Sequence, residues 1–99
     1  MNLRYHQEAS HELDEVYRWY ETQQSGLGTR FISELEASIN RIQNFPYIGN
    51  VIVKDIRRAL LPDFPYGVMY SIKDDMLEIV AVAHLHRKPF YWKNRKPGI

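Results

Sequence analysis

The chain has 99 residues, of which 44% are hydrophobic and 25% are charged, and it contains no cysteine. This length predicts a single domain, residues 1–99, and the composition excludes a disordered chain and a disulfide-stabilised scaffold. No apolar stretch approaches the roughly 20 residues that span a bilayer, and the N-terminus lacks the basic and then apolar layout of a signal peptide. We therefore expect a protein of the cytoplasm that is not bound to a membrane.

The net charge of +1 is unevenly distributed along the chain. Residues 1–53 carry four arginines against seven acids, a balance of −3, whereas residues 54–99 carry nine Lys or Arg against five acids, a balance of +4. A basic second half favours an anionic partner for that half. The excess is small, and a chance asymmetry explains it equally well.

The first half of the chain predicts a helix that begins at about Gln7. The apolar residues recur at spacings of four, three and four, which places them on one helical face. These residues are Ala9, Leu13, Val16 and Tyr20. The charged residues Glu8, Glu12, Asp14, Glu15 and Arg18 occupy the remaining positions. Residues 2–5, ahead of this helix, alternate loosely and are compatible with a short strand.

A turn at residues 25–28, which contains two glycines, separates this helix from a second one. Apolar residues at spacings of four, four and three predict the second helix over residues 29–44. They are Phe31, Leu35, Ile39 and Ile42. We expect Thr29 or Gly28 to cap its start. Pro46 stops it, because the residue before a proline disfavours the helical conformation.

The second half predicts strands over residues 56–61, 66–72 and 77–84, whereas residues 45–50 are predicted to be a loop. The last strand is apolar on both faces after Glu78, which is typical of a central strand. Packing the helical hairpin on a three- to four-stranded, mainly antiparallel sheet buries the apolar face of each. We therefore predict a two-layer α+β fold.

Two adjacent arginines, Arg57 and Arg58, lie on the first predicted strand of this sheet. Neighbouring side chains of a strand point to opposite faces, so one arginine faces the helices or the rim and the other faces the open side. The open-face arginine is suited to holding a phosphate or a carboxylate with its guanidinium. The alternative is an exposed arginine that only keeps the sheet soluble.

The tail from His84 onward contains five Lys or Arg, three aromatic residues and no acid. Cations interleaved with aromatics are typical of a surface for an anionic or nucleic-acid partner. The candidate contacts are Arg87, Lys88, Tyr91, Trp92 and Arg95, with Trp19 of the first helix as a further one. The alternative is that Phe90 and Trp92 fold back over the sheet, and we expect at least one of these two to be structural.

His84 and His86 are two residues apart and share a face if the strand continues, a spacing that can bind a metal. No cysteine or nearby acid pair completes a coordination shell, so we expect no metal and no other cofactor. One histidine then caps the end of the strand and the other joins a polar cluster. Either has the chemistry of a general acid or base.

The motifs along the chain also suggest a family. Their order is Ala9…Leu13…Tyr20, Gly26-Leu27-Gly28, Phe31…Leu35, Pro46, Arg57-Arg58, Phe64-Pro65-Tyr66, Ala81-Val82-Ala83-His84, Arg87-Lys88-Pro89, Tyr91-Trp92 and Arg95. This order resembles the RelE/ParE superfamily of bacterial type II toxin–antitoxin toxins, and most closely its ParE-like, plasmid-stabilisation branch. The match covers nearly the whole chain, and its most specific part is Phe64-Pro65-Tyr66 together with the tail.

The resemblance implies a small, growth-inhibiting toxin with the RelE/ParE-like two-layer fold. A cognate antitoxin, usually encoded beside the toxin, would neutralise it, and promoter DNA would be bound only through the antitoxin complex. The ParE-like branch is associated with poisoning DNA gyrase, whereas the RelE-like branch cleaves mRNA in the ribosome.

Metal-free RNA cleavage requires a base, an acid and cations around the phosphate. In this sequence the candidates are His84 or His86 as base or acid, Arg57, Arg58 and Arg87 as phosphate clamps, and Tyr91 as the orienting group. The RelE-like pattern places a further basic residue near Gly67, but residues 66–72 contain no cation. Arginine is also a poor base, because it stays protonated. We therefore predict a ParE-like protein that binds its target without catalysis. An mRNA endonuclease and an inert, antitoxin-binding relative are the alternatives.

Overall fold

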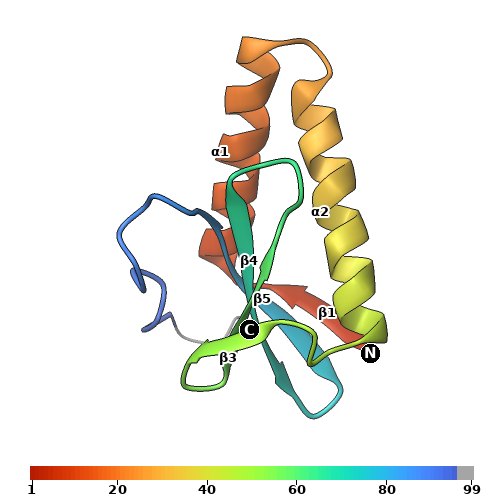
Figure 1. Cartoon of the computed structure of the whole chain (residues 1–99), viewed down its shortest axis with the longest axis vertical. Coiled ribbons are helices and arrows are strands. Elements are labelled where there is room, and N and C mark those ends of the chain that lie inside the picture. Colours follow the sequence, from red (N-terminus) through yellow and green to blue (C-terminus); the bar gives the residue numbers. More distant parts are fainter. Residues whose placement is uncertain (96–99) are drawn as a thin grey trace.

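The computed structural model describes residues 1–95 and shows a helical hairpin on one face of a five-stranded sheet (Figure 1). The helices are α1 (Gln7–Gln23) and α2 (Leu27–Asn44). The strands are β1 (Asn2–Tyr5), β2 (Asn50–Val53), β3 (Ile56–Leu60), β4 (Tyr66–Lys73) and β5 (Met76–His84). The predicted α+β architecture is confirmed. Neither helix is long and apolar enough to cross a membrane, as judged over residues 1–95.

The sheet has the order β1-β5-β4-β3-β2, and only the β1–β5 pair is parallel. The prediction of three to four strands is too low. The strand that was missed is β2, which has four residues and a register shift between Val51 and Val53. So short a segment offers too little alternation to stand out from the loop before it.

The turn between the helices also differs from its prediction. Helix α2 begins at Leu27, after Gly26 in the left-handed conformation with φ 88°, so neither Gly28 nor Thr29 caps it. The Glu21 carboxylate caps it instead. That carboxylate accepts the backbone N–H groups of Gly26, Gly28 and Thr29 at 3.2, 2.8 and 3.2 Å. A side chain from the preceding helix therefore satisfies N–H groups that a helix start leaves open.

The strands carry apolar residues on both faces, so the sheet separates two apolar clusters. The larger lies under the helices and includes Phe31, Leu35, Tyr70 and Ile79. The smaller lies on the opposite face and consists of Ile56, Met69, Val80, Ala81 and Ala83, closed by Trp92. The tail supplies this tryptophan, and we call its described part, residues 85–95, the strap. Lys96, the last tail cation, lies outside the described residues.

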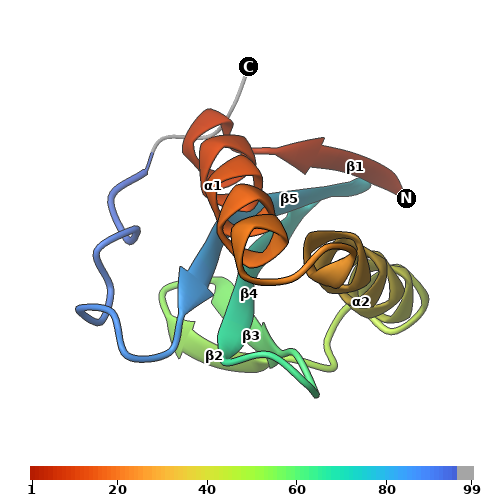
Figure 2. The same ribbon diagram turned by 90° about the horizontal axis from the view of Figure 1, so that it is seen from above.

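The strap has no helix or strand of its own (Figure 2). It leaves the end of β5, where the N–H of Leu85 donates to the carbonyl of Pro65 at 2.9 Å. In Figure 2 the strap and α2 lie on opposite sides of α1. The basic and aromatic tail thus starts from the end of β5 and lies next to α1.

Candidate functional site

The two adjacent arginines of β3 lie on opposite faces of the sheet, as predicted. Arg57 pairs across the ladder with Tyr70 of the helix-side cluster, whereas Arg58 pairs with Met69 of the other cluster. The Arg57 guanidinium donates to the carbonyls of Gly49 and Tyr47 at 2.7 and 3.3 Å. Arg57 therefore holds the loop before β2, and Arg58 is the arginine of the open face.

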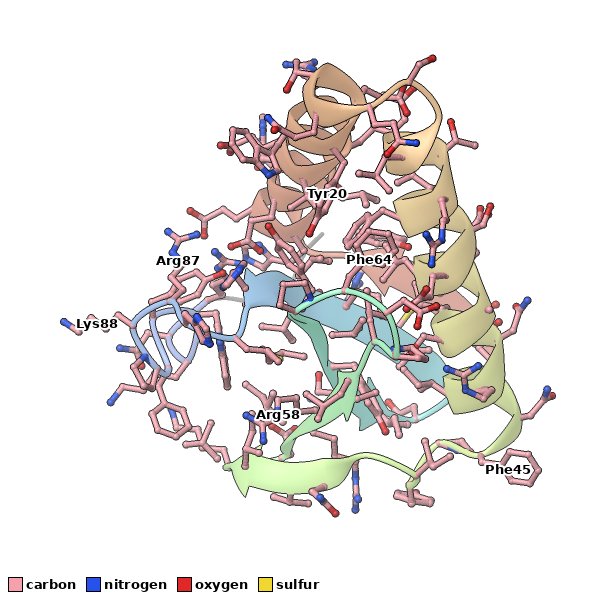
Figure 3. The ribbon with its side chains drawn as sticks, turned by 45° about the horizontal axis from the view of Figure 1, so that its top comes forward. Tyr20, Phe45, Arg58, Phe64, Arg87 and Lys88 are labelled. Carbon is pink, nitrogen blue, oxygen red and sulfur yellow. The ribbon has the colours of Figure 1, made fainter. Side chains whose placement is uncertain are left out.

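Arg58 is exposed, and its side chain has no hydrogen bond or ion pair with another residue of the described chain. Its stem crosses Gly67 of the next strand, where an added Cβ would lie 3.3 Å from the Arg58 Cγ. A larger residue at Gly67 would thus push the arginine aside. In Figure 3 the side chain lies between the lower strands and the strap. Its charge is free for a partner.

Arg58 lines a hollow of about 450 Å³ between β2 and the strap, which we call the strap hollow. Val51 and Ile52 form its wall on the β2 side, and the strap forms the opposite wall. The lining residues that carry a cation or an imidazole are Arg58, Arg87, Lys88 and His84. None of the described residues that line the strap hollow is an acid. The strap hollow therefore combines apolar walls with positively charged side chains.

The strap is tied to the rest of the molecule by Glu12, a residue that was assigned to the polar positions of α1. This assignment is wrong, because Glu12 is only 9% exposed. The two Arg95 terminal nitrogens donate to the two Glu12 oxygens at 2.9 Å each, and the Tyr91 hydroxyl donates to Oε2. Oε1 also accepts the N–H of Val82 at 3.1 Å. One carboxylate therefore joins α1, β5 and the strap.

Glu12 had a recognisable signal in the sequence. It lies three residues after Ala9 and four before Val16, and both of these side chains are buried. An acid in line with a buried stripe is expected to have a buried partner, because an unpaired buried charge is costly. The partners could not be read from local spacing, since Arg95 lies 83 residues further along the chain.

Two of the strap's cations, Arg87 and Arg95, are engaged by acids of α1 and by the Tyr91 ring. Arg87 lies over the Tyr91 ring at 3.9 Å and forms an ion pair with Glu12 at 3.7 Å. Arg95 also donates to the carbonyl of Val80 at 2.9 Å and pairs with Glu8 at 3.3 Å. Burial, followed by the hydrogen bond to Glu12, raises the pKa of Tyr91 above its ordinary value. The phenol therefore stays protonated at neutral pH.

The predicted contact residues differ in how far their side chains are exposed to solvent. Trp92 is 3% exposed and packs in the smaller cluster, which confirms that one of the two strap aromatics is structural. The Arg95 side chain is only 10% exposed, so it is not left in water as a binding cation. Trp19, at 58%, and Lys88 remain at the surface. Trp92 and Arg95 are therefore too buried to belong to the predicted contact surface.

His84 and His86 lie close together, with their ring centroids 5.2 Å apart. His84 Nδ1 accepts the backbone N–H of His86 at 3.0 Å, which leaves Nε2 to carry the proton of the neutral ring. His84 lines the strap hollow, and His86 does not. Across residues 1–95, no group of three or more His, Asp or Glu side chains is placed to hold a metal ion.

Both a family model and solved structures match this chain. A family model described as the ParE toxin of the type II toxin–antitoxin system parDE matches residues 3–89. Among solved structures, the chain is similar to one of the chromosomal ParDE TA system from P. aeruginosa, with a TM-score of 0.74 and 17% identity over 85% of this chain and 95% of that chain. Identity this low establishes the shared fold alone. A comparison with curated proteins gives no match.

Proposed function

Because the chain belongs to the ParE toxin family of type II toxin–antitoxin systems, whose model matches residues 3–89, we propose that it inhibits growth until a cognate antitoxin neutralises it. The resemblance inferred from the sequence is confirmed at the level of the family. We further propose that the protein acts in the bacterial cytoplasm by binding a macromolecular target, with DNA gyrase as the first candidate.

The engagement of Tyr91 by the buried Glu12 is the observation that favours binding over catalysis. A catalytic tyrosine or arginine has to contact the reacting phosphate, but the Tyr91 hydroxyl and both Arg95 terminal nitrogens are bonded to one carboxylate. Arg57 is similarly occupied by backbone carbonyls. Among the described residues that line the strap hollow, Arg58 and Lys88 are the cations without an ion pair, and free cations suit the binding of an anionic group.

A ribosome-dependent mRNA endonuclease is the second candidate. The observation in its favour is that His84, Arg58 and Arg87 line the same hollow. An imidazole near two guanidinium groups has the chemistry for proton transfer beside a phosphate. Tyr91 would then have to leave Glu12 when substrate binds.

Induced expression in bacteria without an antitoxin tests both candidates. We expect growth arrest with a DNA-damage response and intact transcripts, and we expect the purified protein to inhibit gyrase supercoiling. Cleaved transcripts together with unaffected gyrase would assign the protein to the endonuclease class. Normal growth at a verified protein level would make the chain an inert relative and overturn the proposal. Arg58→Ala should weaken arrest, whereas Arg18→Ala, on the exposed side of α1, should not.

A further inference from the structure

The strap hollow has the size and the lining of a small-molecule site. Its volume of about 450 Å³ lies within the range of roughly 300 to 1,000 Å³ that is usual for such sites. Val51 and Ile52 form the β2 wall, and Met69 and Ala83 of the sheet form the floor. Each described residue that lines the strap hollow is apolar, aromatic, a cation or a histidine. This lining suits a ligand with an apolar body, because polar groups in contact with apolar walls would lose their hydrogen bonds to water.

Phe90 is presented at the rim of the strap hollow by a strained backbone. Its φ of 61° lies in the left-handed region, which a bulky side chain rarely adopts. The ring is 43% exposed, lines the strap hollow and meets the Trp92 ring edge-on at a centroid distance of 5.8 Å. Backbone strain of this kind is found most often at ligand sites. The Phe90 ring is therefore placed to cover the apolar part of a ligand.

Arg58 offers the strap hollow one unpaired guanidinium. Of the two other cations in the lining, Arg87 is paired with Glu12, and Lys88 extends outward from the strap in Figure 3. The Arg58 stem lies against Gly67, which keeps the charged end beside the strap hollow. A guanidinium holds a carboxylate through two parallel hydrogen bonds. The charge therefore matches a ligand with a single carboxylate at one end.

We propose that the strap hollow binds an amphipathic carboxylate of the fatty-acid type. The carboxylate would lie on the Arg58 guanidinium, and the acyl chain would run between β2 and the strap, with Phe90 over it. The aliphatic β2 wall and floor favour an acyl chain over a nucleotide, whose base and sugar carry donors and acceptors that such walls leave unsatisfied. The protein would bind this ligand whether or not it is a toxin, so the site goes beyond the proposed function.

The test titrates the isotope-labelled full chain with hexanoate, octanoate and decanoate and follows the binding by NMR. We expect saturable shifts of the Met69 methyl group, the Trp92 indole N–H and the Arg58 guanidinium. The affinity should rise by about fourfold for each methylene that is added and buried.

Two further probes separate the chain from the charge. Decyltrimethylammonium has a chain of the same length with a positive head group, and adenosine monophosphate has an anionic group with a polar, ring-shaped body. Both should bind at least about tenfold more weakly than decanoate, because the first meets like charges and the second lacks an apolar body.

Variants of the chain locate the two ends of the ligand. Arg58→Gln should weaken decanoate binding by about tenfold or more, because it removes a charge-assisted pair of hydrogen bonds. Phe90→Ala should weaken it by about fivefold or more, because it uncovers the acyl chain. The matched controls are Arg18→Gln on α1 and Phe45→Ala after α2, both at exposed positions outside the strap hollow, and they should leave the affinity unchanged. Thermal unfolding checks that all four variants fold.

Four results would overturn the proposal. The first is the absence of saturable shifts at Met69 and Trp92, and the second is equal affinity for hexanoate and decanoate. The third is binding of decyltrimethylammonium or adenosine monophosphate as tight as that of decanoate, and the nucleotide result would assign the strap hollow to nucleotides. The fourth is unchanged binding in both Arg58→Gln and Phe90→Ala, which would place the ligand elsewhere on the protein.

Discussion

Glu12 shows how one residue sets the position of a whole segment. Its carboxylate is 9% exposed and meets Arg95 through two bonds, with Tyr91 and Val82 as further donors. A buried carboxylate is stable only when its oxygens are paired. Every partner except Val82 lies on the strap, so the cost of leaving Glu12 unpaired keeps the strap closed.

At this scale we predict that Glu12→Gln lowers the free energy of unfolding by about 3 kcal/mol, because it leaves Arg95 without its buried partner. The strap should open as well, and trypsin should cleave after Arg87 and Lys93 faster than in the unaltered chain. Urea denaturation and timed proteolysis measure the two effects. Asp14→Asn, which removes an exposed acid of the same helix, is the control. Equal effects in both variants would show that Glu12 does not hold the strap in place.

The strands show which elements can be predicted from sequence. Ranges for β3, β4 and β5 were close to those found. Strands β4 and β5 have runs of alternating or wholly apolar residues, and the prolines at 62 and 65 separate β3 from β4. Strand β2 was not predicted, and α2 begins at Leu27 rather than at the predicted residue 29. Both depend on distant groups: β2 on its pairing with β3, and α2 on the Glu21 carboxylate. The residue pattern within one segment does not reveal partners that lie elsewhere in the chain.

The turn between the helices gives a pH prediction. Hydrogen bonds from the backbone, that of Gly26 first, lower the pKa of Glu21 below its ordinary value of 4.5. A carboxylate with a depressed folded-state pKa stabilises the fold above its unfolded value and loses that effect as pH falls through the folded value. We expect Glu21→Gln to flatten the acid side of the stability profile below about pH 4.5. Urea midpoints from pH 7 to 2 measure it. An equal change in Glu15→Gln would refute the assignment to the turn.

The loop before β2 gives a second prediction for an element. Tyr70→Phe removes the acceptor of the buried Gly49 N–H and the donor to Pro46, and should cost about 2 kcal/mol of unfolding free energy. Hydrogen exchange at residues 47–51 should speed up more than exchange in the helices. Tyr17→Phe, in which the altered ring is at the surface, should change neither quantity. Uniform acceleration would mean that Tyr70 stabilises the core without fixing the loop.

For the whole molecule, the two-layer prediction described one face of the sheet, and a cover for the other face was expected only from Phe90 or Trp92 folding back over it. The helix-side cluster follows from the helical stripes and the strand pattern. The smaller cluster does not, because its closing residue, Trp92, belongs to a segment without regular structure. Membership in the family was predictable from the order of the motifs. The bonds from Glu12 of α1 to Tyr91 and Arg95 of the strap became visible only in the three-dimensional structure.

The two strap aromatics give the last prediction. Trp92 is 3% exposed and covers the smaller cluster, whereas Phe90 is 43% exposed and contacts Trp92 at a centroid distance of 5.8 Å. Trp92→Ala should cost about 3 to 5 kcal/mol, because it removes a large buried ring and uncovers apolar strand residues. Phe90→Ala should cost less than about 1 kcal/mol. Thermal unfolding, with binding of a hydrophobic dye as the readout of exposed surface, distinguishes them. If both variants lost equal stability, the strap would stabilise the sheet through the packing of the whole segment, and Trp92 would have no special place in it.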